Sequence, residues 1–216
     1  MTINKLKRLL LNSLNSVMVG IYISIGCISY LLTDNKLIGS TLFVIGLFLV
    51  MNFSNLLYTR LNPLLPFAQN KKEHILLILQ SLIGNFIGAY LIAYIFQLTR
   101  LNIKLQTKAY KLVQLKVADT DISLFILAIF CGILVGYGVL LSLRQKCLID
   151  KTISILIPVV IFVFCGFEHS IADMFYISCS QMWNKCTIIK ISVIIIGNFV
   201  GGYLVGLIDN LSHNIK

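Results

Sequence analysis

Six mostly apolar segments, separated by short polar stretches, occupy most of this chain. A helix needs about 20 apolar residues to cross the hydrocarbon core of a bilayer, and most of the segments reach or approach that length. The pattern therefore predicts an all-α membrane protein with six transmembrane helices and no room for a separate soluble domain. The segments are residues 13–33, 37–53, 74–98, 121–143, 152–165 with a continuation to 177, and 187–208.

An internal repeat divides these segments into two sets of three. Residues 84–91 read Gly-Asn-Phe-Ile-Gly-Ala-Tyr-Leu, and residues 197–204 read Gly-Asn-Phe-Val-Gly-Gly-Tyr-Leu. Glycine-rich helix faces can look alike because small residues allow close packing, but the length of the match favours duplication of a three-helix unit. Since three is odd, the second unit enters the membrane from the opposite side, which gives inverted repeats. We expect one transmembrane domain, residues 1–216, with repeats at about 10–98 and 120–210.

The second and fifth segments are interrupted by polar residues. Residues 52–55 and Asn62-Pro63 bracket the short stretch 56–61, and residues 165–170 (Cys-Gly-Phe-Glu-His-Ser) interrupt the fifth segment. Non-helical backbone at membrane depth is tolerated only against protein or water. Broken helices at matching positions of an inverted repeat typically flank a substrate path. We therefore expect both breaks to line a path through the bundle.

The composition and charge agree with a membrane protein. The chain is 58% hydrophobic and 12% charged, with a mean hydropathy of +0.91. With the N-terminus inside, ten Lys and Arg lie in cytoplasmic segments and seven in outer ones, which favours cytoplasmic N- and C-termini. The basic N-terminus precedes an apolar run that continues through Leu32, so we interpret it as the first helix of a multi-pass protein of the cell (inner) membrane. The net charge of +10 follows from this topology, and we expect no nucleic-acid partner.

Groups suited to catalysis or cofactor binding are sparse. The six cysteines form no CxxC pair, although Cys179 and Cys186 share a connecting segment in which a disulfide is one alternative. A haem-binding electron carrier or an intramembrane enzyme would need paired histidines, and of His74, His169 and His213 only His169 lies at bilayer depth. No nucleotide-binding loop or nucleophile constellation is recognisable, so we expect no enzyme and no cofactor.

Glu168 and His169 are the most informative residues of the chain. A charged side chain at the centre of a bilayer costs about 2.5–3.5 kcal/mol on insertion scales, so such residues usually face a cavity and have a function. A lone membrane histidine can also serve as an interhelical hydrogen-bonding group. The break and the repeat favour the first interpretation.

Residues 166–175 (Gly-Phe-Glu-His-Ser-Ile-Ala-Asp-Met-Phe) closely resemble the GFEHSxANMF signature of the formate/nitrite transporter family. Residues 84–89, 197–202 and 20–26 are similar to the motifs of its third, sixth and first helices, so the resemblance covers nearly the whole chain. It implies an aquaporin-like fold in the lipid bilayer and a homopentameric channel with one pore per protomer. The substrates would be small monovalent anions such as formate, nitrite, hydrosulfide or lactate.

The resemblance also implies site residues. His169 would be the pore histidine, Phe162 and Leu47 the cytoplasmic-side constriction, and Leu57-Tyr58-Thr59 the other constriction, with a hydroxyl on Thr59. The sixth-helix asparagine would be Asn198, and Lys116 resembles the lysine before the fourth helix. Three positions depart from the family pattern and leave the selectivity open: Arg60 in place of glycine, Gly136 in place of asparagine, and Asp173 in place of asparagine.

These residues suggest a proton-linked mechanism. A bare anion is disfavoured between two hydrophobic constrictions, and a histidine with an ordinary pKa of about 6.5 can exchange protons at neutral pH. The basic segment 99–120 would attract the anion, which would take up a proton near His169 and cross as the acid or as an ion pair with imidazolium. Glu168 would anchor the broken backbone by accepting amide N–H groups. Asp173, if in contact with His169, would favour imidazolium. The alternative is a structural or regulatory membrane subunit without transport.

Overall fold

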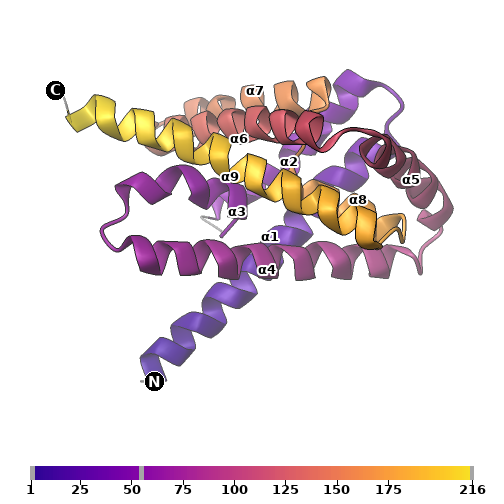
Figure 1. Ribbon diagram of the computed structural model, residues 1–216, viewed down its shortest axis with the longest axis horizontal. Helices are drawn as coiled ribbons and strands as arrows, with labels where there is room; N and C mark the ends of the chain where they lie inside the picture. Colours follow the sequence, from indigo (N-terminus) through magenta and orange to yellow (C-terminus); the bar gives the residue numbers. More distant parts are fainter. Residues whose placement is uncertain (1–2, 54–55, 215–216) are drawn as a thin grey trace.

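The computed structural model describes residues 3–53 and 56–214, and all regular elements in these ranges are helices (Figure 1). Its elements, in chain order, are α1 (Ile3–Leu32), α2 (Lys36–Asn52), α3 (Tyr58–Leu61), η1 (Asn62–Phe67), α4 (Lys71–Phe96), α5 (Asn102–Ala118), α6 (Asp121–Arg144), α7 (Leu148–Cys165), α8 (Ser170–Cys179) and α9 (Lys185–Asn214).

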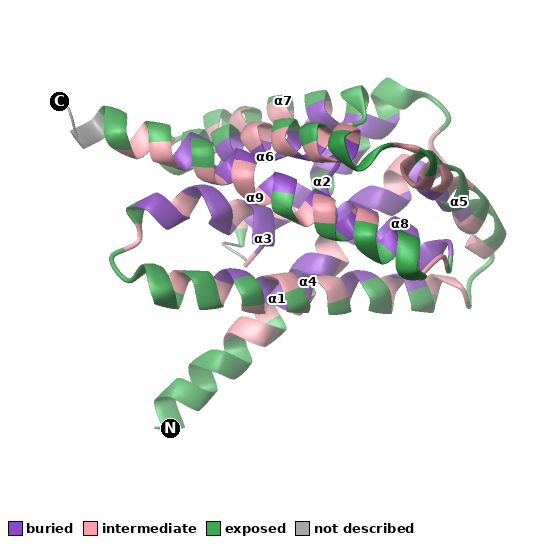
Figure 2. Cartoon of the chain, in the orientation of Figure 1, coloured by how far each residue is buried: buried purple, intermediate pink, exposed green. Residues whose placement is uncertain are grey.

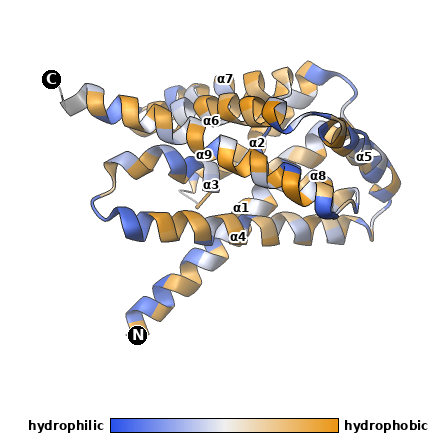
Figure 3. Cartoon of the chain, in the orientation of Figure 1, coloured by the Kyte–Doolittle hydropathy of each residue, from blue (hydrophilic) through white to orange (hydrophobic). Residues whose placement is uncertain are grey.

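The six predicted transmembrane segments are confirmed, with breaks in the second and fifth. Within the described ranges, α1, α4, α6, α7 and α9 are long and apolar enough to cross a membrane. The sixth, α2, has 17 residues and is continued after its break by α3 and η1, as α7 is continued by α8. Figure 3 shows apolar residues along these helices, and many large apolar side chains are exposed, as expected of a surface that meets lipid or another subunit.

The repeated glycine motifs make the same contact in both halves. The first copy lies on α4, which packs along α1, and the second lies on α9, which packs along α6. A Cβ added to Gly88 would lie 2.0 Å from the Val17 carbonyl oxygen, and one added to Gly201 would lie 2.1 Å from that of Ile129. Only glycine permits these close helix approaches, so the sequence repeat corresponds to a structural repeat.

The two halves interlock at their broken helices. The second piece of the fifth segment, α8, packs against α4 of the first half, and η1 packs against α9 of the second half. The unbroken parts α2 and α7 pack against each other between the halves. The buried positions in Figure 2 therefore converge on the region between the two breaks.

The amphipathic helix α5 covers one end of the bundle. It packs against α8 and buries Leu105, Ala109 and Val113. On its polar side, Lys108 forms an ion pair with Asp34 in the α1–α2 connection (2.6 Å), and hydrogen bonding and the positive charge lower the pKa of Asp34. All six cysteines are free, so the alternative of a disulfide between Cys179 and Cys186 is wrong: Cys179 is buried in α8 and Cys186 is exposed on α9.

Candidate functional site

The break between α7 and α8 places His169 at the start of a helix. Gly166 ends α7 in the left-handed conformation (φ 79°), which glycine adopts without steric cost. Two residues later the chain enters α8 with His169 as its N-cap, and the His169 Nδ1 accepts a hydrogen bond from the Ala172 amide (3.3 Å). The orientation of the imidazole is therefore set in part by a hydrogen bond to the first turn of its own helix.

The two breaks meet at His169 and Thr59. Thr59 lies on the short α3 just after the first break, and its Oγ1 is 3.1 Å from the Nε2 of His169. Both residues are buried, with 1% and 3% exposure. Because Nδ1 accepts a backbone N–H, the ring proton of a neutral His169 is on Nε2, which donates it to the Thr59 hydroxyl oxygen.

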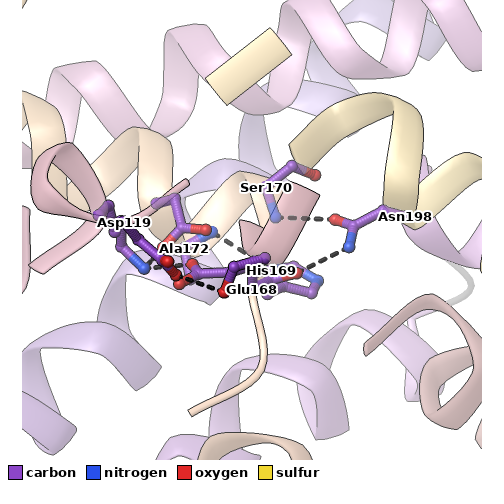
Figure 4. Close-up of polar contacts among 9 residues, drawn as sticks. Asp119, Glu168, His169, Ser170, Ala172 and Asn198 are labelled. Atoms are coloured by element: carbon purple, nitrogen blue, oxygen red, sulfur yellow. Dashed lines mark hydrogen bonds and ion pairs between the residues drawn. The ribbon is translucent and has the colours of Figure 1, made fainter. Parts of the chain in front are cut away.

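Two asparagines at equivalent positions of the repeat hold the two breaks. Asn198 donates to the carbonyls of Glu168 (2.7 Å) and Ala128 (2.9 Å) and accepts from the Ser170 amide (2.8 Å), as Figure 4 shows for the contacts at the break. Asn198 was expected in the pore, but it has 0% exposure and these three bonds use its amide group, so it is a positioning residue.

Asn85 does the same for the first break. It accepts from the Tyr58 amide (2.9 Å) and donates to the carbonyls of Leu56 (2.9 Å) and Ser16 (2.8 Å). Asn85 was absent from the residues expected at the site, although its place in the repeated motif opposite Asn198 was a signal that could have identified it.

Lys116 joins the site from α5. Its Nζ forms ion pairs with Glu168 and with Asp173 (2.9 Å to the latter), and both carboxyl groups are buried. Burial lowers the pKa of Lys116, but its contacts with the Asp173 and Glu168 carboxyl groups outweigh burial and raise the pKa overall, so the side chain is an ammonium. The expectation that the Glu168 carboxylate accepts backbone amides is wrong: it pairs with Lys116, and only its main-chain carbonyl binds Asn198.

A cavity of about 310 Å³ leads to His169. The Phe162 ring stacks on His169 at a centroid distance of 5.6 Å and contacts Phe43 edge-on at 5.8 Å. The charged and aromatic residues that line this cavity include Tyr30, Lys36, Phe43, Lys116, Asp119, Phe162, Glu168, His169 and Asp173.

The position of Phe162 in the bundle bears on the expected orientation of the chain. Tyr30 and Lys36 flank the α1–α2 connection, so the cavity opens at the end of the bundle opposite the start of α1. Phe162 and its aromatic partner Phe43 thus lie toward that end, so the two expectations of cytoplasmic termini and a cytoplasmic-side Phe162 exclude each other. Leu47 is buried, with 4% exposure.

The remaining expected residues lie near the first break. Leu57 and Tyr58 are buried, and the Tyr58 hydroxyl donates to the Ile195 carbonyl of α9 (2.9 Å). Gly136 lies where a Cβ would be 3.2 Å from that of Val205, so this part of α6 is packed against α9. Arg60 is half-buried on α3.

Relatives of known name are similar to this chain over most of its length. The chain is 27% identical over 193 residues to a formate channel, FocA, of Haemophilus influenzae, covering 79% of this chain and 66% of that one. It is 28% identical to FocA of Escherichia coli (75% and 63%) and 30% identical to the formate channel BtFdhC of Bacillus thuringiensis (77% and 69%). The chain thus spans about two thirds of the length of these curated relatives.

Solved structures have the same fold. A structure described as a pentameric formate channel with formate bound matches with a TM-score of 0.83 at 23% identity, covering 97% of this chain and 99% of that one. A second, an ion channel of the FNT family, matches with a TM-score of 0.77 at 21% identity (95% and 90%). The family model for formate/nitrite transporters matches residues 4–209. The chain belongs to the formate/nitrite transporter family.

Proposed function

We propose that this protein is a transmembrane channel for small monovalent anions or their conjugate acids, with formate, nitrite and hydrosulfide as candidates, and that passage is proton-linked through His169. The observation that carries the proposal is the contact between Thr59 Oγ1 and His169 Nε2, which joins the two helix breaks at the inner end of the cavity. The names of the relatives, three of them formate channels, support formate as the first substrate to test.

The site offers an anion hydrogen-bond donors and a polar approach. The His169 Nε2 and the Thr59 hydroxyl lie 3.1 Å apart and can each donate to an anion placed beside them, and Lys36 contributes positive charge to the cavity. The stacked Phe162 and its neighbour Phe43 make the approach narrow and apolar, which disfavours a bare anion over the neutral acid. A proton added to the ring must go to Nδ1, so proton uptake by His169 competes with the capping bond to Ala172.

We also propose that the protein acts as a homopentamer with both termini in the cytoplasm. The pentameric structure that shares this fold supports the assembly, and the exposed apolar side chains of the bundle supply surface for lipid and for neighbouring subunits. With this orientation the cavity beside α5 faces outward.

Reconstitution into proteoliposomes tests the proposal. We expect uptake of at least one of formate, nitrite and hydrosulfide, measured at two pH values, and a flux lowered about tenfold or more by His169→Phe, which corresponds to about 1.4 kcal/mol in the barrier. The variant should also lose most of the pH dependence. Absence of flux for every anion would favour a structural or regulatory subunit, and unchanged flux in the variant would refute the role of His169.

A further inference from the structure

Lys116, Glu168 and Asp173 form a buried cluster with unequal charges. The Lys116 ammonium contacts both carboxyl groups, and the side chains are 14%, 7% and 3% exposed. If both carboxyl groups were ionised, the cluster would carry one net negative charge. An uncompensated charge is costly in a buried site, and this one would lie in the wall of the cavity through which an anion must pass.

The contacts of Asp173 indicate how the charge is balanced. Its Oδ1 is bonded to Lys116, whereas its buried Oδ2 has no conventional hydrogen-bond donor among the residues that the structure describes. The Glu168 and Asp173 carboxyl groups both contact the same Lys116 Nζ, so the two groups are held side by side in a buried site. Two ionised carboxylates are acceptors only and repel each other, so holding them together beside one ammonium favours a proton on one of them.

The other titratable groups near Asp173 supply no positive charge that could balance a second carboxylate in place of that proton. His169 is engaged with Thr59 and Ala172 through its two ring nitrogens, and Lys36 and Asp119 line the same cavity with opposite charges. The remaining titratable neighbours are thiols and phenols, which carry no positive charge in any protonation state: Cys27 and Tyr30 on α1, Cys131 on α6, and Tyr176 and Cys179 on α8. Lys116 is thus the cation in contact with the pair within the described ranges.

We infer, building on the proposed function, that the conducting channel holds Asp173 as a carboxylic acid hydrogen-bonded to Glu168, and that loss of this proton excludes anions. In the protonated state the ammonium and one carboxylate balance, and an anion can approach His169. In the deprotonated state the cavity wall carries one net negative charge beside the substrate path and repels the anion. Asp173 is therefore a specificity-determining residue that adds pH control to the channel.

Asparagine at this position has the shape of the protonated acid and cannot lose a proton. Formate exchange in proteoliposomes, with equal pH on both sides between about 5.5 and 8.5, should give a ratio of native to Asp173→Asn flux that is constant at the acidic end. Above the apparent pKa of the cluster the ratio should fall about tenfold per pH unit, as for loss of a single proton. Taking the ratio removes the ionisation of formate and of His169, which both proteins share.

Two further variants complete the test. Asp119→Asn removes a carboxylate that lines the same cavity outside the cluster, so its ratio to native should show no such step. Glu168→Gln leaves one carboxylate for Lys116. The formate flux of this variant should therefore not fall at alkaline pH, as expected also for Asp173→Asn. Size-exclusion chromatography in detergent establishes that each variant is folded and assembled before flux is compared. A native pH profile retained in Asp173→Asn would overturn the inference.

Infrared difference spectroscopy supplies a readout that does not depend on transport. The native protein should show the carbonyl stretch of a protonated carboxylic acid that disappears as the pH is raised, and Asp173→Asn should lack it. No band in the native protein overturns the inference. If no anion is carried by the native protein, the proposed function fails and the pH control with it, while the infrared band still decides whether Asp173 is protonated.

Discussion

The two ring nitrogens of His169 have separate partners, and together these contacts set the orientation of the ring. Nδ1 is tied to its own helix through the Ala172 amide, while Nε2 faces Thr59 of the other half. The ring is further held by stacking on Phe162. In the proposed function, a substrate anion would meet a donor whose direction is set before the anion arrives, which would lower the cost of ordering the site on binding.

Removing the Thr59 hydroxyl should slow transport. In Thr59→Val the side chain keeps its shape, but His169 Nε2 loses its partner and the substrate loses one donor. A single hydrogen bond contributes about 0.5–1.5 kcal/mol net, so we expect formate flux in proteoliposomes to fall about 3- to 10-fold. Thr59→Ser retains the hydroxyl and should remain close to native. Equal fluxes for the Val and Ser variants would contradict a role for the hydroxyl.

At the scale of the elements, each broken helix depends on one asparagine of the repeated motif. A transmembrane break exposes backbone amides and carbonyls that water cannot reach, and Asn85 and Asn198 each make three bonds to such groups or to the neighbouring helix. The duplicated motif therefore combines two functions: its glycines let helices approach and its asparagine satisfies the break.

Replacing either asparagine by alanine should destabilise the protein by a similar amount. Each change leaves buried backbone groups without partners, at about 1–3 kcal/mol for each group, so we expect a clearly lower thermal midpoint in detergent for Asn85→Ala and for Asn198→Ala. Gln80→Ala on α4 removes hydrogen bonds of a partly exposed side chain and is the matched control, with a small effect expected. Midpoints that match this control would show that the breaks are stable without the asparagines.

The features of the fold and the site that could be predicted from the sequence are local patterns, whereas the features that could not be predicted are contacts between residues far apart in the chain. The repeat and the polar breaks at Thr59 and His169 are local patterns with a direct structural meaning. The partner of Glu168 is not local: Lys116 lies 52 residues earlier on a helix outside the bundle, and only the docking of α5 brings it close. The aromatic partner of Phe162 is not local either: Phe43 lies on α2, and the packing of α2 against α7 brings the two rings together.

At the scale of the whole molecule, the bundle has two distinct ends. One carries the start of α1, the η1–α4 connection and the ion pair between Arg8 and Glu73; the other carries α5 and the cavity. Three cysteines are exposed, and two of them mark the ends: Cys147 precedes α7, Cys186 lies in the first turn of α9, and Cys165 is the last residue of α7.

Native cysteines can therefore test the proposed orientation. With both termini cytoplasmic, a membrane-impermeant maleimide added to intact cells should label Cys186, and Cys147 should react only after the membrane is permeabilised. Labelling is followed as a mass shift of the purified protein, with Cys186→Ser and Cys147→Ser assigning the reactive thiols. Labelling of Cys147 in intact cells would mean that the protein is inserted in the opposite direction.

The interlocking of the two halves has a consequence for biosynthesis. The face of α4 that receives α8, and the side of η1 that receives α9, are complete only when residues 170–214 have been made. A nascent chain that has inserted its first three spans therefore presents unfinished polar and glycine-lined surfaces within the bilayer. The translocon or a membrane chaperone would have to shield those surfaces until the last helix arrives, so release of the channel into lipid is a late and all-or-none event.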